Sequence, residues 1–401
     1  MEPGVGRLRP ARSPLAEHWQ LDPSITFLNH GSFGATPTIV LEEQNRIRHL
    51  MESDPVRFFE RESHDLHSEA LNSLAQFLNA DVDGLTFCHN ATGGVNTILR
   101  SLELELGDEI IVPNHAYQAC WNAVDFVCRR WGAKTVVVNI PFRVENEDQL
   151  IELLLDAITP RTVLAMIDTV TSPTGLRMPF ERLVDEFQSR NIDVLLDAAH
   201  GPGIVPLNLQ ALDAAYITGN CHKWLCTPKG SAFLHIREDR KDRIKPLTIG
   251  HGYSSVASKQ EKFRFEFDWQ GTHDPSSFFS IPTALEFMQG LVPDGFSGII
   301  QHNNKLARDG RELLCEVLNT TPPVPDSMIT AMAAIELPGG HTGPPDFTGD
   351  PLHNSLLDEH GIQVPVFPWQ HHQTRYMRIS SYLYNSEKEY KFLAEKLLNY
   401  L

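Results

Sequence analysis

Basic residues, paired cysteines and long apolar runs are all scarce in this sequence. Its 34 Lys and Arg residues are outnumbered by 51 Asp and Glu residues, which gives a net charge of −17, and no basic block reverses that balance. Because nucleic acids and anionic membranes attract cations, this charge argues against both as partners. No apolar run approaches the length of a membrane span, so we expect no membrane-spanning segment.

The cysteines show no CxxC or other metal-ligand spacing; they are Cys88, Cys120, Cys128, Cys221, Cys226 and Cys315. A chain of 401 residues needs no disulfide scaffold, so we expect no metal site and a reduced, cytoplasmic setting. The first residues include basic residues and proline but lack the apolar core that a signal peptide needs. We expect residues 1–22 to form a flexible arm.

What the sequence does contain is a long alternation of short apolar runs and helical patterns. At 401 residues and 41% hydrophobic content, two domains are expected, a large one over 23–290 and a small one over 291–401. The alternation predicts an α/β fold with a doubly wound, mainly parallel sheet. Its expected strands are 85–88, 109–113, 134–139, 162–168, 192–196, 214–218 and 230–236. After Phe296 the pattern changes to that of a smaller α+β domain, with a Pro/Gly-rich loop over 337–351.

Two of these strands end next to an acid and an amine. The apolar run 192–196 stops at Asp197, and the run 214–218 leads into a turn that carries Lys223. Pyridoxal phosphate (PLP) needs a lysine that holds it as a Schiff base and a carboxylate that keeps its ring nitrogen protonated. Asp197 and Lys223 on neighbouring strand ends suit both needs, although a buried ion pair with a surface lysine would give the same pattern.

The residues around this pair carry a family resemblance. The pattern Asp197-x-x-His200, followed by Asn220-x-His222-Lys223, resembles the class V aminotransferase group of fold-type I PLP enzymes. Within that group the opening stretch 27–34, FLNHGSFG, resembles the isopenicillin N epimerase-like branch, and the resemblance runs from about residue 26 to about residue 385. It implies the fold-type I PLP-dependent transferase fold, an amino acid as substrate and a homodimer.

A phosphate site is predicted where the strand 85–88 turns into a helix. The turn contains Ala91, Thr92 and Gly93, and the following residues have helical spacing. A helix N-terminus presents free backbone N–H groups and a positive dipole end, which together favour a phosphate, and Thr92 adds a hydroxyl donor. The family resemblance assigns this turn to the cofactor phosphate, whereas helix capping alone would use the same residues.

The resemblance also implies the remaining cofactor contacts. It places His115 over the cofactor, with Tyr117 sharing that role or acting in proton transfer. It places Ser172 against the ring oxygen, although asparagine is usual at that position. The other implied contacts are His200 with the ring, Asn220 and His222 with ring and phosphate, and Thr272 with the phosphate of a partner subunit. Without the resemblance, each would be a satisfied polar residue or a helix cap.

One arginine stands out in the C-terminal part. Arg378 lies within an otherwise apolar strand pattern, and its planar, always-charged group suits a two-point grip on a substrate carboxylate. The family has Arg-x-Ser at this place, and it also implies that the stretch around Asn29 lines the substrate side. Arg57 and Arg61, four residues apart on a predicted helix that opens at Pro55, are weaker candidates.

The reaction is the least determined feature. A cysteine desulfurase of this group needs a cysteine in the loop before Arg378, but that loop, VPVFPWQHHQTRY, has none, and Cys315 fits a helix core. Epimerisation needs proton donors on both faces of a carbanion, which Lys223 and either His115 or Tyr117 could supply. We therefore rank an epimerase first. A carbon–sulfur lyase acting on a cysteine conjugate, an aminotransferase, and a non-catalytic binding protein of the same fold stay as alternatives.

Overall fold

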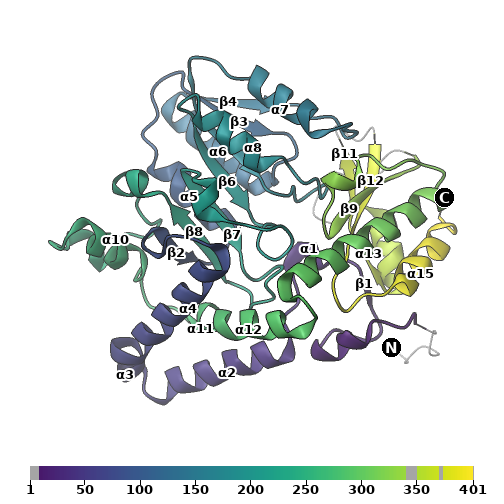
Figure 1. The fold of residues 1–401 in the computed structure, drawn as a ribbon, viewed down its shortest axis with the longest axis horizontal. Coiled ribbons are helices and arrows are strands. Elements are labelled where there is room, and N and C mark those ends of the chain that lie inside the picture. Colours follow the sequence, from purple (N-terminus) through teal and green to yellow (C-terminus); the bar gives the residue numbers. More distant parts are fainter. Residues whose placement is uncertain (1–8, 340–349, 370–373, 401) are drawn as a thin grey trace.

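The main body of the protein is a seven-stranded sheet covered on both faces (Figure 1). The computed structural model describes residues 9–339, 350–369 and 374–400. All strands of this sheet run in one direction except β8, which is antiparallel to both its neighbours. In spatial order the strands are β2 (Leu85–Cys88), β8 (Ala232–Ile236), β7 (Tyr216–Asn220), β6 (Asp193–Ala198), β5 (Thr162–Asp168), β3 (Glu109–Pro113) and β4 (Lys134–Val138). Each predicted strand is present, displaced by at most two residues.

Side chains of this sheet alternate between two separate apolar cores. Leu195 of β6 packs with one cluster and its neighbour Leu196 packs with the other. Helices α5 (Ala91–Ser101) and α6 (Gln118–Trp131) cover the first face, whereas α7 (Glu147–Asp156) and α8 (Phe180–Gln188) cover the second. A sheet that is buried on both faces explains the near-continuous apolar runs of its central strands. The doubly wound fold is confirmed.

The C-terminal part forms a smaller layered unit. Its antiparallel sheet has the order β11 (Val366–Trp369), β12 (Thr374–Ser380) and β9 (Met332–Leu337). Helices α13 (Gly295–Val317), α14 (Pro351–His360) and α15 (Glu387–Leu397) complete it (Figure 1). The stretch 364–376, expected to be a loop, instead supplies β11 and the start of β12, so that expectation was wrong. Residues 340–349 of the other expected loop lie outside the described residues.

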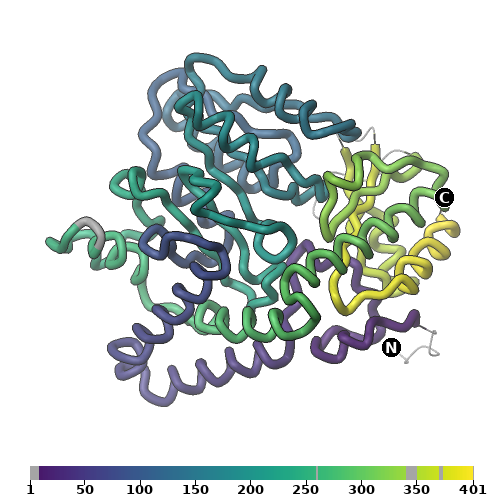
Figure 2. Tube along the Cα trace, viewed as in Figure 1, coloured from purple at the N-terminus to yellow at the C-terminus, as the bar shows by residue number. Residues whose placement is uncertain are grey.

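The N-terminal segment packs against this smaller unit. Strand β1 (Thr26–Phe27) pairs in parallel with β10 (Ile362–Gln363). Figure 2 shows the two ends of the chain side by side, in purple and yellow. Trp19 is buried in the main core, and its indole N–H donates to the carbonyl of Ala35 over 3.2 Å. The described part of the expected flexible arm, residues 9–22, is therefore held against the protein. Burial of the large apolar indole ring of Trp19 stabilises this packed position.

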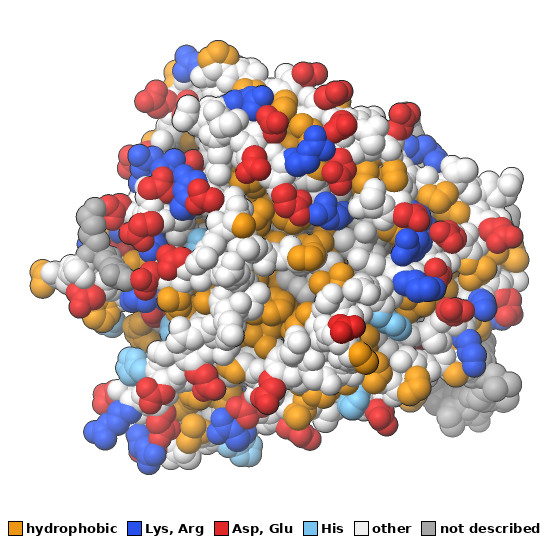
Figure 3. Space-filling model, in the orientation of Figure 1, with side chains coloured by type: hydrophobic (Ala, Val, Ile, Leu, Met, Phe, Trp, Pro, Cys, Tyr) orange, Lys and Arg blue, Asp and Glu red, His pale blue; other side chains and the backbone are white. Residues whose placement is uncertain are grey.

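Most of the remaining helices lie along the lower edge and one end of the main body (Figure 1). Pro55 opens a helical turn, as predicted, and Asp54 caps that turn. No helix among the described residues is long and apolar enough to cross a membrane. On the face shown in Figure 3, acidic and basic side chains are interspersed, with no large basic patch. The helices are α1 (His30–Phe33), α2 (Thr38–Ser53), α3 (Pro55–Arg57), α4 (Ser63–Leu78), α9 (Leu209–Leu212), α10 (Lys259–Phe267), α11 (Ser276–Phe279) and α12 (Ile281–Leu291).

Candidate active site

Asp197 and Lys223 meet at the carboxyl end of two adjacent strands. Strands β6 and β7 pair in parallel as far as Ala198 and Gly219. Asp197 is the next-to-last residue of β6, and Lys223 follows β7 by three residues. Parallel strands direct their carboxyl ends to the same edge of a sheet, where ligands of such folds bind. The structure thus brings the predicted acid and amine to one place.

The Lys223 amine lies in a buried, partly cationic environment. Its Nζ is 3.0 Å from Nε2 of His200. Burial and, to a smaller extent, the positive charge of Arg378 lower the pKa of Lys223 to about 8, although Asp197 acts in the opposite direction. A lysine in such surroundings is a neutral amine for part of the time near neutral pH, as a nucleophile or base must be.

The turn that carries Lys223 is held from both ends of the chain. His30 of α1 donates from Nε2 to the backbone carbonyl of Lys223 over 2.9 Å, and its Nδ1 lies 2.7 Å from the Tyr384 hydroxyl. Tyr382 donates to the carbonyl of Trp224 over 3.1 Å. Gly34 has a φ of +71°, and a Cβ there would lie 2.2 Å from the carbonyl oxygen of His222, so only glycine fits. These contacts explain the physical need for His30 and Gly34 in the FLNHGSFG stretch.

Asp197 accepts two hydrogen bonds that fix its carboxylate. The backbone N–H of Ala199 donates to Oδ1 over 2.9 Å, and the Cys120 thiol donates to Oδ2 over 3.3 Å. Burial raises the pKa of Asp197, while these two donors and Lys223 lower it. A second carboxylate, Asp168, ends the neighbouring strand β5 at the same level. Sequence reasoning missed Cys120 and Asp168 as site residues, although Asp168 was expected at a strand end.

The predicted phosphate turn forms the first turn of α5. Asn90 accepts from the backbone N–H of Gly93 over 2.8 Å, and Asn220 accepts from that of Ala91 over 2.9 Å. Asn220 therefore ties the helix to β7 through its amide oxygen, and the structure brings together Ala91, Gly93 and Asn220 as predicted. Neither of these bonds uses the N–H of Thr92. Asn90 was missed, although an Asn two residues before Thr-Gly is a recognisable N-cap.

His115 and Tyr117 are placed very differently. His115 is buried, with Nδ1 2.8 Å from the Thr174 hydroxyl and Nε2 3.3 Å from the carbonyl of Ile140. Burial lowers its pKa to about 4, so its ring is neutral near pH 7. Tyr117 precedes α6, and its side chain is 46% exposed. Both ring nitrogens of His115 are engaged, whereas Tyr117 points to the surface.

Of the other predicted cofactor residues, Ser172 and His222 hydrogen-bond within the protein, whereas Thr272 is exposed. Ser172 contributes its backbone carbonyl, which accepts from Arg378. His222 lies 2.8 Å through Nδ1 from the carbonyl of Ser231, and burial lowers its pKa to about 4. Thr272 is exposed and lines a pocket at the other side of the phosphate turn.

Arg378 is buried, and its neighbours accept hydrogen bonds from only some of its N–H groups. Its Nη1 donates to the carbonyl of Ser172, and its Nη2 lies 3.1 Å from both Asn29 Oδ1 and Ser32 Oγ. Its Nε is buried with no partner among the described residues, and burial lowers its pKa to about 10. A buried guanidinium without a carboxylate costs free energy, so the arrangement suits an incoming anion. Asn29 and Arg378 are brought together as predicted, whereas Arg57 and Arg61 are exposed on the outer surface.

The residues fit PLP. The buried carboxylate of Asp197 would keep a ring nitrogen protonated, the buried amine of Lys223 would form the Schiff base, and the Thr92 N–H and hydroxyl lie at a helix N-terminus, where a phosphate binds. Space is available there too, because a Cβ on Gly93 would meet nothing closer than Asn90 Oδ1, at 3.5 Å. No cluster of side chains with metal-ligand geometry is found in the described part of the chain.

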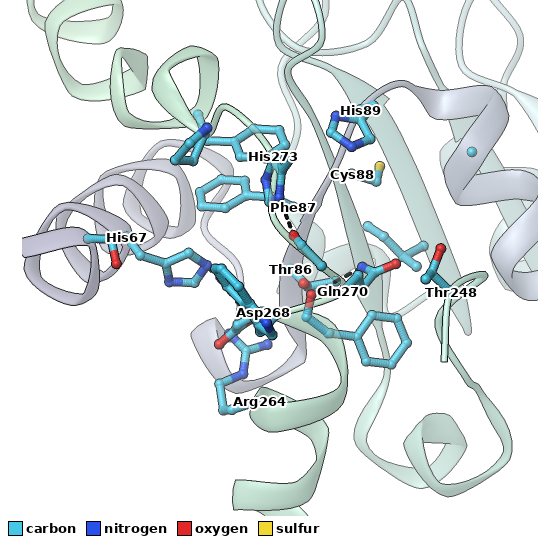
Figure 4. Close-up of a pocket in the computed structure, with 18 of the residues that line it drawn as sticks. His67, Thr86, Phe87, Cys88, His89, Thr248, Arg264, Asp268, Gln270 and His273 are labelled. Carbon is cyan, nitrogen blue, oxygen red and sulfur yellow. Dashed lines mark hydrogen bonds and ion pairs between the residues drawn. The ribbon is translucent and has the colours of Figure 1, made fainter. Parts of the chain in front are cut away.

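A pocket of about 600 Å³ adjoins the outer side of the phosphate turn. It includes Asn90 and Gly93 but not Lys223, Asp197 or Arg378. Figure 4 shows His67, Phe87, His89, Asp268 and His273 around it. Its walls are more apolar than polar and include six phenylalanines and Trp269, so it is chemically distinct from the polar site at the strand ends.

The chain is similar to known proteins over most of its length. The chain is 32% identical over 398 residues to isopenicillin N epimerase of Amycolatopsis lactamdurans, covering 95% of this chain and 96% of the relative. It is 26% identical over 333 residues to hercynylcysteine sulfoxide lyase of Schizosaccharomyces pombe, covering 81% and 83%. In fold it is similar to a mutant of C-DES with glycine covalently linked to its PLP cofactor, with a TM-score of 0.79, 19% identity, and coverage of 96% and 99%.

The family model described as aminotransferase class V matches residues 37–393. This range includes Asp197, Lys223 and Arg378, whereas the stretch 29–34 of the site precedes it. The chain therefore belongs to the class V aminotransferase family of PLP-dependent enzymes.

Proposed function

We propose that this protein binds PLP through Lys223 and acts at the α-carbon of an amino acid. The observation that carries the proposal is the position of the Lys223 amine, which is buried within the influence of both Asp197 and Arg378. An amine, an acid and a guanidinium at the carboxyl ends of a doubly wound sheet supply a covalent anchor, a ring partner and a carboxylate binder.

Each residue has a definite task in this proposal. When bound, PLP supplies an electron sink that makes the α-proton of an amino acid acidic. Lys223 holds the cofactor and, once released by substrate, takes and returns the α-proton at Nζ. Asp197 keeps the ring nitrogen protonated, and Arg378 orients the substrate through its carboxylate. Thr92 donates to the phosphate from its N–H and hydroxyl.

We rank an epimerase-like reaction first. It is supported by the two relatives named isopenicillin N epimerase, which are 32% and 28% identical to this chain and are covered almost fully by it. A second proton donor on the opposite face is the demanding requirement of this reaction. Tyr117 is partly exposed and His115 is neutral with both nitrogens engaged, so the second donor must come from a rearranged side chain or from water.

That requirement gives a carbon–sulfur lyase its support as the second candidate. A lyase acting on a cysteine conjugate needs Lys223 and an acid for the leaving sulfur, but no donor on both faces of the α-carbon. Relatives named hercynylcysteine sulfoxide lyase and L-cysteine desulfhydrase are 26% and 27% identical to this chain. Transamination, the third candidate, also uses only Lys223 for proton transfer.

One experiment separates the three reactions. The purified enzyme, loaded with PLP, is incubated in heavy water with a panel of amino acids and cysteine conjugates. Deuterated amino acid of inverted configuration supports epimerisation, whereas pyruvate with ammonia supports the lyase. A keto acid formed only alongside the aminated cofactor supports an aminotransferase. Protein that stays colourless and ignores added PLP would refute the proposal in favour of a non-catalytic protein of this fold.

We also propose a homodimer in a reduced, cytoplasmic setting. The dimer is supported by Thr272, which lies exposed at the position that the family uses to reach a partner's phosphate. A second support is a segment that we call the apolar arm, residues 247–267. It ends in α10 and projects from the main body (Figure 1). It exposes five large apolar side chains, an unusual number for a surface that stays in water, namely Leu247, Ile249, Tyr253, Val256 and Phe265. The setting is supported by the six cysteines, which are all free.

A further inference from the structure

Trp224, the residue after Lys223, contacts the histidine that contacts the lysine. Its indole Nε1 donates to Nδ1 of His200 over 3.1 Å, and Nε2 of the same ring lies 3.0 Å from Nζ of Lys223. Trp224 and His200 are both buried. The three side chains therefore form a linear chain of two hydrogen bonds, from Trp224 through His200 to Lys223.

The indole decides that direction. An indole N–H can only donate, so Nδ1 of His200 must accept and cannot carry a proton. A neutral imidazole has one proton, which must then lie on Nε2 and point at Nζ of Lys223. That bond forms only if Nζ offers a lone pair, which an amine has and an ammonium lacks. If Lys223 were protonated, its N–H groups and the Nε2–H of His200 would both be donors, and no hydrogen bond could form between them.

A charged His200 would not resolve the conflict. An imidazolium carries protons on both nitrogens, so its Nδ1–H would face the indole N–H of Trp224. Burial lowers the pKa of His200 well below its usual value, and the positive charge of Arg378 lowers it further. The neutral ring with its proton on Nε2 is thus the form that satisfies all contacts.

We propose that Trp224 is a positioning residue that fixes the tautomer of His200 and thereby keeps Lys223 as a neutral amine. The inference rests on the proposed function, because a neutral Nζ is the form that attacks the aldehyde carbon of PLP and that accepts an α-proton. In that capture the amine nitrogen bonds to the aldehyde carbon and water leaves, so no other reactant is needed.

The other charged groups around Lys223 show why such a device is useful. Asp197 and Asp168 favour the ammonium form, as would a Cys120 thiolate, whereas Arg378 disfavours it. Two buried carboxyl groups at the ends of adjacent strands would stabilise a charged lysine strongly if both were ionised. The hydrogen-bond chain from Trp224 favours the neutral amine of Lys223 and so opposes the effect of these carboxylates, without adding a charge to the site.

The test uses the pH dependence of PLP capture. PLP is removed from the purified protein, and its recapture is followed by absorbance between pH 6 and pH 10. Trp224→Phe keeps an aromatic ring but lacks the N–H, so His200 can turn its lone pair towards an ammonium. The midpoint of the rate profile should rise by about one pH unit, which makes capture about tenfold slower at pH 7. An unchanged midpoint would overturn the proposal.

Two further variants make the result specific. In a His200→Gln background, Trp224→Phe should cause no further shift, because the ring that links the two residues is gone; a second shift of equal size would overturn the proposal. Trp131→Phe makes the same exchange at the end of α6, where the side chain is 40% exposed. It should leave the midpoint where it is in the wild type.

A direct measurement does not depend on the folding of a Trp224 variant. In wild-type protein without PLP, labelled with ¹⁵N-histidine, the His200 signals are assigned by their loss in His200→Gln. Nε2 should be protonated and Nδ1 unprotonated from pH 6 to pH 9; the opposite tautomer would overturn the proposal. Failure of wild-type protein to capture PLP at any pH would refute the proposed function instead, whereas capture with an unshifted Trp224→Phe midpoint refutes only the role of Trp224.

Discussion

Asp168 and Asp197 occupy directly facing positions at the ends of β5 and β6. Residues paired in this way on parallel strands point to the same face of the sheet, so the two carboxyl groups share one buried space. Oδ2 of Asp168 has no partner among the described residues. Burial raises the pKa of both acids, and the charge of Asp197 raises the pKa of Asp168 well above its usual value. Asp168 is therefore the neutral member of the pair.

Asp168→Asn should stabilise the protein without PLP, and more so as the pH rises. In the folded protein Asp168 keeps its proton at pH values where the unfolded chain has lost it. The free energy of unfolding of the wild type therefore falls as the pH rises from the unfolded pKa, near 3.8, to the raised native pKa. Asparagine does not titrate. We expect the gain in the free energy of unfolding to be about 1 kcal/mol larger at pH 8 than at pH 5. Urea denaturation at both pH values measures it, and an equal gain at both would contradict the neutral state of Asp168.

Lys223→Ala should abolish covalent cofactor binding. The wild-type protein should be yellow, and borohydride should bleach it and fix PLP to the chain, because the reduced bond to Nζ no longer hydrolyses. The matched control is Lys229→Ala, which removes a lysine six residues further along, with Nζ 3.4 Å from Thr36 Oγ1. Mass spectrometry after reduction should find PLP on the control and none on the Lys223 variant. Irreversible labelling of the Lys223→Ala protein would show that another residue is the anchor.

Arg378→Lys should weaken the binding of substrate much more than that of PLP. A lysine keeps the charge but loses the planar pair of donors, so the KM for the amino acid should rise by about tenfold or more while the cofactor absorbance persists. Arg375→Lys is the control, since Arg375 lies on the same strand and pairs with Asp350 over 3.3 Å. Its KM should stay within about twofold of the wild type. Loss of the cofactor from the Arg378 variant would instead point to a role in holding PLP or the fold.

Charges on the apolar arm should separate the proposed dimer. Val256 is fully exposed at 102% and Ile249 at 57%, so Val256→Asp with Ile249→Asp costs no core packing in the single chain. Buried in an interface, two such carboxylates would each cost several kcal/mol. Light scattering should give a dimer for the wild type and a monomer for the variant, with weaker PLP retention in the monomer. Leu398→Asp, at an exposed position of the C-terminal unit, should stay dimeric; a monomeric wild type that retains PLP would rule out the proposed dimer.

Local patterns in the sequence determined most of the fold and the centre of the site. Apolar runs that stop at a polar residue located every strand of the main sheet, because a buried strand needs continuous apolar side chains and its end reaches solvent or ligand. The same reasoning placed Asp197 beside Lys223, since the ends of adjacent parallel strands must meet. Chain order also predicted a helix N-terminus next to Thr92, although the helix begins earlier than expected, at Ala91.

The tertiary structure alone decided which side chains touch. His115 and Tyr117 are two residues apart in the turn between β3 and α6, yet one is buried and the other is nearly half exposed. Nothing local links His30 to the carbonyl of Lys223, which is 193 residues away, or Asp168 to Asp197. Such contacts depend on the order of the strands and on the packing of distant segments, and a hydrogen bond is directional, so its partner is fixed only when both groups are in place.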